Sequence, residues 1–235
     1  MSASPAPFIE FEGPLFRDRR EAGERLARTL AVHRIEDGLV VGLARGGVEV
    51  AAEVAARLGL PLDALAVRKV GHPWHPEYAV GAVTPGGGEF VRAKESLPEE
   101  ELRAAVAAAM EKAEELDRVL HADRPPLDPA ARTVLLVDDG LATGATMTAA
   151  ARWARAAGAA RIVVAVPVGA PETVAALEQE ADEVICLEQP ELFGAVGLWY
   201  ERFSQVSDER VLALLDTADP APRPPGPNDV LARVT

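Results

Sequence analysis

The sequence predicts an α/β protein with a mostly parallel, twisted sheet and helices on both of its faces. Short apolar runs alternate with longer amphipathic stretches along most of the chain, an order that is typical of βαβ units. Glycine or proline marks the point at which several of these stretches end. The 235 residues are enough to bury a substantial core in one main domain.

The first three elements follow from capping and periodicity. Residues 16–30, FRDRREAGERLARTL, predict a helix that Asp18 caps, with Glu21 three positions later. The apolar run LVVGL at residues 39–43 predicts a buried strand. Residues 48–59 then predict a helix that stops at its terminal glycine.

A second strand and a hairpin are expected next. The segment LDALAVRKV, residues 62–70, predicts the strand. The segments YAVGAV at 78–83 and EFVRA at 89–93 predict a hairpin, because the TPGGG between them is rich in turn residues.

The clearest helix of the sequence lies at residues 96–121. Ser96 and Glu99 form its expected capping box, and apolar residues recur along one of its faces. The helix follows the hairpin, and we expect it either to cap the sheet or to contribute to a homodimer contact.

The second half of the chain alternates regularly between strand and helix. The expected elements are residues 133–137, 145–158, 161–168, 171–180 and 183–187. Residues 219–235 contain too much proline and glycine to pack as a regular element. We therefore expect the main domain at residues 1–218 and a tail at 219–235.

Charge and cysteine content exclude several classes of protein. The net charge of −13 and the pI near 4.8 argue against broad binding to nucleic acids or anionic membranes, because both require a cationic field. No run approaches the ~18 apolar residues of a membrane span, and the N-terminus does not resemble a signal peptide. Cys186 is the only cysteine, so we expect a free core thiol and a reducing, cytoplasmic location. An anionic ligand must therefore be held by local groups.

The stretch VLLVDDGLATGAT, residues 134–146, predicts an anion site. After the strand, the amides of residues 142–146 enter the first turn of a helix without partners, and the helix dipole adds positive charge there. Gly144 lets the backbone approach an anion closely, and Thr143 and Thr146 add hydroxyl donors. These features favour a phosphate in the loop.

Asp138 and Asp139 stand directly before that loop. They would repel a phosphate, so they are expected to face a group that donates protons, as a ribose diol does. Each hydroxyl-to-carboxylate bond contributes ~1.5–3 kcal/mol, which is enough for the pair to orient a sugar. Loop and acids together predict a site for ribose 5-phosphate.

The same stretch closely resembles the phosphoribosyl-pyrophosphate (PRPP) signature of type I phosphoribosyltransferases. The resemblance covers residues 39–187 well and implies a core at about 36–188. It implies that Asp138 and Asp139 bind the ribose diol. The residues it assigns to the 5'-phosphate are Ala142, Thr143, Gly144, Ala145 and Thr146.

The resemblance places a pyrophosphate loop at GLARGG, after the first core strand. Ala44, Arg45 and Gly46 would present backbone amides and one guanidinium group there. In the family this loop often holds a non-proline cis peptide, which would fall between Ala44 and Arg45. Taken alone, GLARGG is equally typical of an ordinary glycine-rich turn. Its position relative to the PRPP signature makes the pyrophosphate-loop interpretation persuasive.

A third part of the expected PRPP site follows the expected second strand. Arg68 and Lys69 end that strand, so they should reach the same sheet edge and complement the leaving pyrophosphate. Residues 71–77 match the place of the family's mobile catalytic lid. His72 and His75 of this segment are expected to be loop residues rather than a metal pair.

The resemblance implies transfer of ribose 5-phosphate from PRPP to a small planar nitrogen base, with release of pyrophosphate. Arg45, Arg68 and Lys69 would be the catalytic residues that neutralise the leaving group, together with Mg²⁺. The Mg²⁺ would bind mainly through PRPP or pyrophosphate oxygens, so no dedicated metal-ligating residues are expected.

Two differences from related enzymes narrow the choice of acceptor base. Ala142 stands where enzymes that salvage 6-oxopurines carry an acid, and Lys69 stands alone where orotate enzymes carry several lysines. Transfer to hypoxanthine or guanine and transfer to orotate are therefore both disfavoured. The sequence does not name the acceptor, because the chain also resembles bacterial homologues with no settled substrate.

In this family a variable hood outside the sheet sets base specificity. The hood would come from the N-terminal segment, from about residues 189–210, or from both. The aromatic residues of the second segment either stack on a base or close the core: Phe193, Trp199, Tyr200 and Phe203. Arg17, Arg19 and Arg20 either form a solvated helix face or point towards the phosphates.

Two other functions remain open from the sequence. One is a regulator that keeps the fold to sense PRPP or nucleotides without turnover; the acidic charge and the absence of a recognisable DNA-binding module disfavour it. The other is a hydrolytic or phosphorolytic activity that uses the same pocket.

Overall fold

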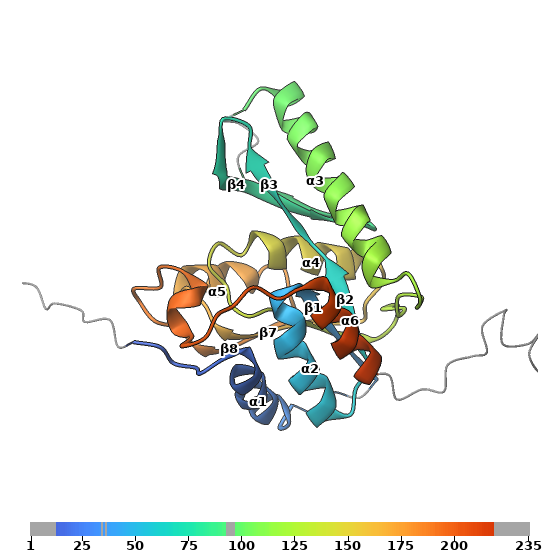
Figure 1. Ribbon diagram of the computed structural model, residues 1–235, viewed down its shortest axis with the longest axis vertical. Helices are drawn as coiled ribbons and strands as arrows, with labels where there is room; N and C mark the ends of the chain where they lie inside the picture. Colours follow the sequence, from blue (N-terminus) through green and yellow to red (C-terminus); the bar gives the residue numbers. More distant parts are fainter. Residues whose placement is uncertain (1–12, 34, 36, 93–96, 219–235) are drawn as a thin grey trace, which may run out of the picture.

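A five-stranded parallel sheet forms the centre of the molecule (Figure 1). The computed structural model describes residues 13–33, 35, 37–92 and 97–218. The strand order is β2-β1-β6-β7-β8, and every pairing is parallel. The strands are β1 (Gly38–Ala44), β2 (Leu62–Ala66), β6 (Thr133–Val137), β7 (Arg161–Val168) and β8 (Glu183–Glu188). The predicted α/β class is confirmed.

Helices cover both faces of this sheet (Figure 1). One face packs against α1 (Arg19–Leu30), α2 (Gly46–Leu58) and α6 (Asp208–Thr217), and the other against α4 (Ala145–Ala156) and α5 (Pro171–Leu177). Within β1, Val40 belongs to the first core, while Leu39 and Val41 belong to the second. This alternation follows from the two-residue period of a strand, and its apolar residues on both faces suit a sheet buried on both sides.

A second, three-stranded antiparallel sheet stands away from the main sheet, at the top of Figure 1. It consists of β3 (Arg68–His72), β4 (His75–Thr84) and β5 (Gly88–Val91). The helix α3 (Glu99–Leu120) packs on it through a small core that contains Val70, Val83 and Ala109. The predicted hairpin is confirmed, and so is the long helix, but its predicted capping box is wrong, because Pro98 is the N-cap and Glu99 is the first helical residue. The helix caps this small sheet, and a role in a homodimer stays a prediction.

Two predicted segments and one helix differ from the prediction. The second strand ends at Ala66, because residues 68–72 pair antiparallel with β4, with Arg68 opposite Val83. The expected lid loop at 71–77 is mostly strand for the same reason, since β3 continues to His72 and β4 begins at His75. The helix α6 was not predicted at all. Ser96 and residues 219–235 lie outside the described residues.

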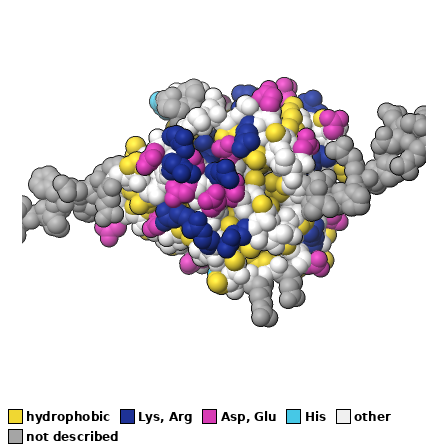
Figure 2. All heavy atoms as spheres, turned by 60° about the horizontal axis from the view of Figure 1, so that its bottom comes forward, with side chains coloured by type: hydrophobic (Ala, Val, Ile, Leu, Met, Phe, Trp, Pro, Cys, Tyr) yellow, Lys and Arg dark blue, Asp and Glu magenta, His cyan; other side chains and the backbone are white. Residues whose placement is uncertain are grey.

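The outer face of α1 and α2 carries charges of both signs (Figure 2). Asp18 caps α1 as predicted, since its Oδ1 accepts a hydrogen bond of 3.0 Å from the Glu21 amide. On the exposed side, Arg20 lies 3.4 Å from both Glu24 and Glu53. Such an intermixed surface is not a basic stripe of the kind that binds a nucleic-acid backbone. Among the described residues, no helix is both long enough and apolar enough to cross a membrane.

Candidate functional site

Two loops meet where the neighbouring strands β1 and β6 end. The strands run parallel, so both loops leave the same edge of the sheet. The loop after β1 contains the predicted cis peptide between Ala44 and Arg45. A Cβ at Gly46 would lie only 2.2 Å from Asp139 Oδ2, and one at Gly47 only 2.6 Å from the Val137 carbonyl. The approach of the two loops therefore requires glycine at both positions.

The expected phosphate loop leads into α4. Gly144 is the N-cap and has a left-handed backbone with φ of 72°. The first hydrogen bond into the helix runs from the Thr148 amide to the Gly144 carbonyl at 2.8 Å, which leaves the amides of the preceding turn without intrahelical partners. Those amides and the dipole of α4 suit an anion at this position.

Side chains from two other elements hold this loop from outside. The Thr173 hydroxyl donates to the Ala142 carbonyl at 2.8 Å. The Arg92 guanidinium, just beyond β5, donates to the Thr143 carbonyl, also at 2.8 Å. The loop shape is therefore fixed by α5 and by the residue after β5, a support that the sequence did not reveal.

The acidic pair is largely buried. The Asp139 side chain is 15% exposed, and the Asp138 carboxylate accepts the Asp139 amide at 2.9 Å. Burial, together with the charge of Asp139, raises the pKa of Asp138 well above its usual value. Burial also raises the pKa of Asp139, although the charge of Arg19 opposes that shift. Two crowded carboxylates of this kind gain strongly from hydroxyl donors or cations.

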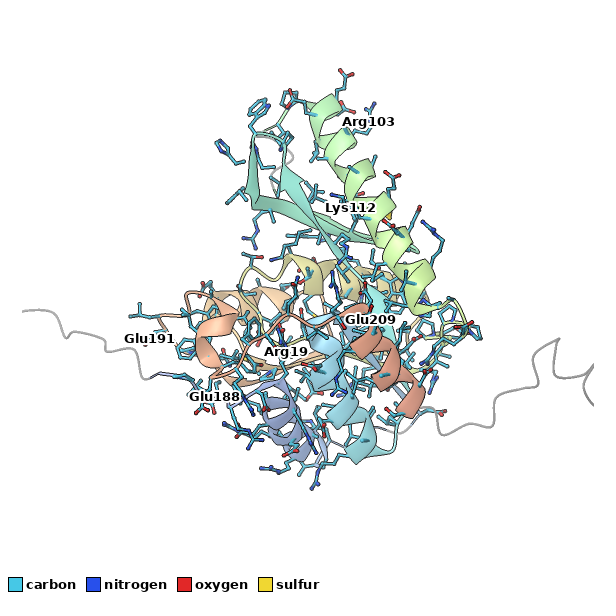
Figure 3. All side chains as sticks on the ribbon, in the orientation of Figure 1. Arg19, Arg103, Lys112, Glu188, Glu191 and Glu209 are labelled. Carbon is cyan, nitrogen blue, oxygen red and sulfur yellow. The ribbon has the colours of Figure 1, made fainter. Side chains whose placement is uncertain are left out.

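Two residues far away in the sequence fix the second acid. Arg19 of α1 donates from Nε to Asp139 Oδ2 at 2.7 Å. The Tyr200 hydroxyl donates to the Asp139 backbone carbonyl at 2.6 Å. Figure 3 shows Arg19 in the interior of the molecule, between α1 and the segment that leads to α6. Of the two meanings left open for Arg19, the structure supports the inward one, whereas Arg17 and Arg20 are exposed.

The three predicted cationic residues have different surroundings. Arg45 contacts the start of α6: it donates from Nη1 to the Val206 carbonyl at 3.3 Å and lies 3.4 Å from Asp208. Burial lowers the pKa of Arg68, and the charge of Arg45 lowers it further, so the two guanidinium groups are close enough to repel. Lys69 is exposed, and its charge favours the ionised form of Asp138. Arg45 and Arg68 therefore act on each other, while Lys69 acts on Asp138, and both Arg68 and Lys69 belong to β3 rather than to β2.

The aromatic residues divide into two groups. Phe193, Trp199 and Tyr200 are buried with Phe16 in one cluster, so for them the core interpretation is confirmed. Phe203 differs, because it is 38% exposed and carries the Arg19 guanidinium 3.8 Å from its ring centre.

A cavity of about 420 Å³ lies between these groups. It joins the end of β1, the second acid and the segment before α6. Its lining residues are Arg19, Arg45, Gly46, Asp139, Phe203, Ser204, Gln205 and Val206. It therefore brings Arg45 and Gly46 of the expected pyrophosphate loop together with Asp139 and with part of the segment that the sequence offered as a hood, whereas residues 142–146 do not line it.

A second group of rings lies at the tip of the β3–β4 hairpin. The His72 ring centre is 5.7 Å from that of Trp74, 5.2 Å from that of His75 and 6.4 Å from that of Tyr78. Trp74 and Tyr78 are largely exposed. Within the described ranges, no three His, Cys, Asp or Glu side chains are grouped as metal ligands.

Comparison with known proteins agrees with this geometry. The profile of the phosphoribosyl transferase domain matches residues 18–200. Two Mycobacterium tuberculosis sequences that bear the phosphoribosyl transferase name are 44% identical over 211 residues, which are 87% of this chain and 47% of each relative. The chain thus spans about half the length of these curated relatives.

Two further relatives are matched over most of their length. The adenine phosphoribosyltransferase of Mycobacterium marinum is 34% identical over 180 residues, which are 74% of this chain and 80% of that protein. The crystal structure of TT1426 from Thermus thermophilus is 45% identical with a TM-score of 0.74, and the match covers 85% of this chain and 97% of that one. The chain therefore belongs to the phosphoribosyl transferase domain family.

Proposed function

We propose that the protein transfers ribose 5-phosphate from PRPP to a nitrogen base and releases pyrophosphate. The observation that carries the proposal is the meeting of the cis Ala44–Arg45 loop, the acidic pair and the Gly144 turn at one edge of the sheet. We propose a nitrogen base as the acceptor because the chain belongs to the phosphoribosyl transferase domain family and because one of its relatives is named for adenine.

In this proposal each part of the site binds one part of PRPP. The amides of residues 142–146 bind the 5'-phosphate, and Asp138 and Asp139 accept the ribose hydroxyls. The amides of Ala44 to Gly46 bind the diphosphate, and the charges of Arg45, Arg68 and Lys69 stabilise it as it leaves. The oxocarbenium-like sugar then lies between the acids and the acceptor.

These groups also suit a Mg²⁺ ion that arrives with the diphosphate. The donors on the diphosphate side are amides and guanidinium groups, which bind phosphate oxygens and leave the cation to be held through those oxygens. When bound, Mg²⁺ would neutralise charge on the leaving group. The β3–β4 hairpin is the segment that we propose excludes water, since PRPP would otherwise be hydrolysed.

Calorimetric titration with PRPP in the presence of Mg²⁺ tests the ribose site. The double variant Asp138→Asn/Asp139→Asn should bind PRPP at least ~100-fold more weakly, because it loses two charge-assisted bonds of ~1.5–3 kcal/mol each. A matched control, Asp123→Asn/Asp216→Asn, changes two exposed acids outside the site and should keep the wild-type affinity. Equal affinity of the Asp138/Asp139 variant and the wild type would overturn the assignment.

Pyrophosphate release across a panel of nucleobases then tests turnover. Release with at least one base supports the transferase. Tight PRPP binding with no release from any base would instead favour the sensing protein that the sequence left open. Release without a base would favour the hydrolytic activity.

A further inference from the structure

Among the described residues, Arg19 is one of the few charged side chains that are buried, and the residue is only 7% exposed. A buried arginine is costly unless partners satisfy its charge and donors. Its partners come from two segments that are far apart in the sequence. Nε donates to Asp139 Oδ2 at 2.7 Å, Nη1 donates to the Ser204 carbonyl at 2.8 Å, and the guanidinium lies on the Phe203 ring.

These contacts all converge on the 420 Å³ cavity, which Arg19 itself lines. An arginine that only fastened α1 to the body of the protein could do so through the Ser204 carbonyl. Instead its shortest contact goes to the second acid of the proposed ribose site. Gly46 makes room for this pair, since a Cβ there would lie 2.2 Å from Asp139 Oδ2 and 3.1 Å from Arg19 Nε.

We propose that Arg19 is a positioning residue for the ribose site: it holds Asp139 through Oδ2 and leaves Oδ1 to accept a ribose hydroxyl. The inference rests on the proposed function, because it assigns a role to a residue next to the ribose ligands. In the described part of the chain, Arg19 is the side chain that hydrogen-bonds the Asp139 carboxylate, and it does so at Oδ2. Arg19 does not touch the reacting atoms in this arrangement and acts through the carboxylate.

The electrostatic part of the role follows from the groups around Asp139. The charged and titratable groups that act on it are Arg19 from α1, Glu49 from α2, the neighbouring Asp138 and Tyr200 beyond β8, while Lys69 of β3 acts on Asp138. Burial raises the pKa of Asp139, Glu49 raises it further, and Arg19 is the group that lowers it most. Without Arg19, Asp139 should take up a proton at a higher pH and lose its charge-assisted bond to the sugar.

Three variants separate this role from a merely structural one. Arg19→Met removes the charge and the donors, and Arg19→Lys keeps the charge but loses the fork that joins Asp139 to Ser204. Arg20→Met is the matched control, because Arg20 is the exposed neighbour on the same helix. PRPP affinity is measured with Mg²⁺ by calorimetry from about pH 5.5 to about pH 8.5, beside the wild type.

Arg20→Met should bind PRPP with the same affinity as the wild type at each pH, and both should show only the pH dependence that the phosphate groups of PRPP cause. Arg19→Met should bind roughly tenfold more weakly at the acidic end and recover most of that loss at the alkaline end. Arg19→Lys should show a weaker affinity without the added pH dependence. An Arg19→Met variant with wild-type affinity at every pH, or with the same loss at every pH, overturns the inference.

A readout that needs no ligand keeps the two proposals distinguishable. Carbon-13 NMR of the Asp139 carboxyl, assigned with Asp139→Asn, should report a higher pKa in Arg19→Met than in the wild type and a pKa close to that of the wild type in Arg19→Lys, which keeps the charge. An unchanged pKa in Arg19→Met overturns the inference whatever the protein binds. A wild type that fails to bind PRPP while the pKa shift is observed overturns the proposed function instead. If Arg19→Met does not fold, Arg19→Lys alone decides: an affinity that collapses below about pH 7 contradicts the proposal.

Discussion

The turn at Gly144 gives the sharpest test of how the phosphate loop is built. Its φ of 72° lies in the left-handed region, and an added Cβ would approach the Thr173 Cγ2 atom to 2.7 Å. In Gly144→Ala the backbone strain alone should cost ~1–2 kcal/mol of unfolding free energy. The contact with Thr173 adds to this, so we expect a total of about 2–3 kcal/mol.

Thr173→Ser separates the two contributions. It deletes Cγ2 but keeps the hydroxyl that donates to the Ala142 carbonyl. On its own it should cost ~0.8 kcal/mol for the lost buried methyl. In the Thr173→Ser background, Gly144→Ala should cost only ~1–2 kcal/mol, so the cycle should show a favourable coupling of about 1 kcal/mol.

Urea unfolding of the four proteins measures this cycle. PRPP affinity, measured on the same set, should fall in both proteins that carry the Gly144→Ala change, because the strained turn displaces the amides that we propose bind the 5'-phosphate. A Gly144→Ala cost below ~0.5 kcal/mol would contradict the conformational argument. An equal cost in both backgrounds would contradict the contact with Thr173.

Two further predictions concern titratable groups. Burial acts to lower the pKa of His121, but its hydrogen bond and ion pair with Asp63 at 3.2 Å, and the charge of Asp117, outweigh burial and raise it above the usual 6.5. This pair should therefore stabilise the protein fully below about pH 6.5 and lose its contribution as the pH rises through the folded pKa, so urea unfolding should show a decline towards alkaline pH that His121→Gln lacks. Burial raises the pKa of the Cys186 thiol to about 12, so iodoacetamide should label it roughly a thousandfold more slowly in the folded protein than in urea at about pH 8. Equal labelling rates in the two states would contradict the burial of this thiol.

The features that were predicted best from the sequence are those that depend only on neighbouring residues. The signature from Val134 to Thr146 folds as expected because its strand, turn and helix are all specified within one short stretch. The cis peptide at Ala44 was predicted in the same way, from the family resemblance of a local motif. The cap of α1 by Asp18 also needs only the next three residues.

What the sequence missed depends on contacts between distant segments. The run LDALAVRKV contains no signal for a break at Val67, because the break arises when Arg68 pairs with Val83 of a later strand. The partnership of Arg19 with Asp139 spans 120 positions and leaves no periodic trace. The helix α6 did have local signals, since Ser207 caps it and Val211 and Leu215 are buried along one face. The interpretation of residues 189–210 as an aromatic hood takes no account of these signals.

The pairing of Phe16 with Tyr200, and the reach of residues 204 and 206 to Arg19 and Arg45, have a consequence for biosynthesis. The loops that we propose bind the sugar phosphate leave the ribosome while the segment around residues 200–206 is still untranslated. A domain generally folds as a unit, so its contacts with that segment form only after the segment has been synthesised. A nascent chain that ends before residue 200 should therefore be unable to sequester the metabolite, and affinity should appear only once translation has passed that point.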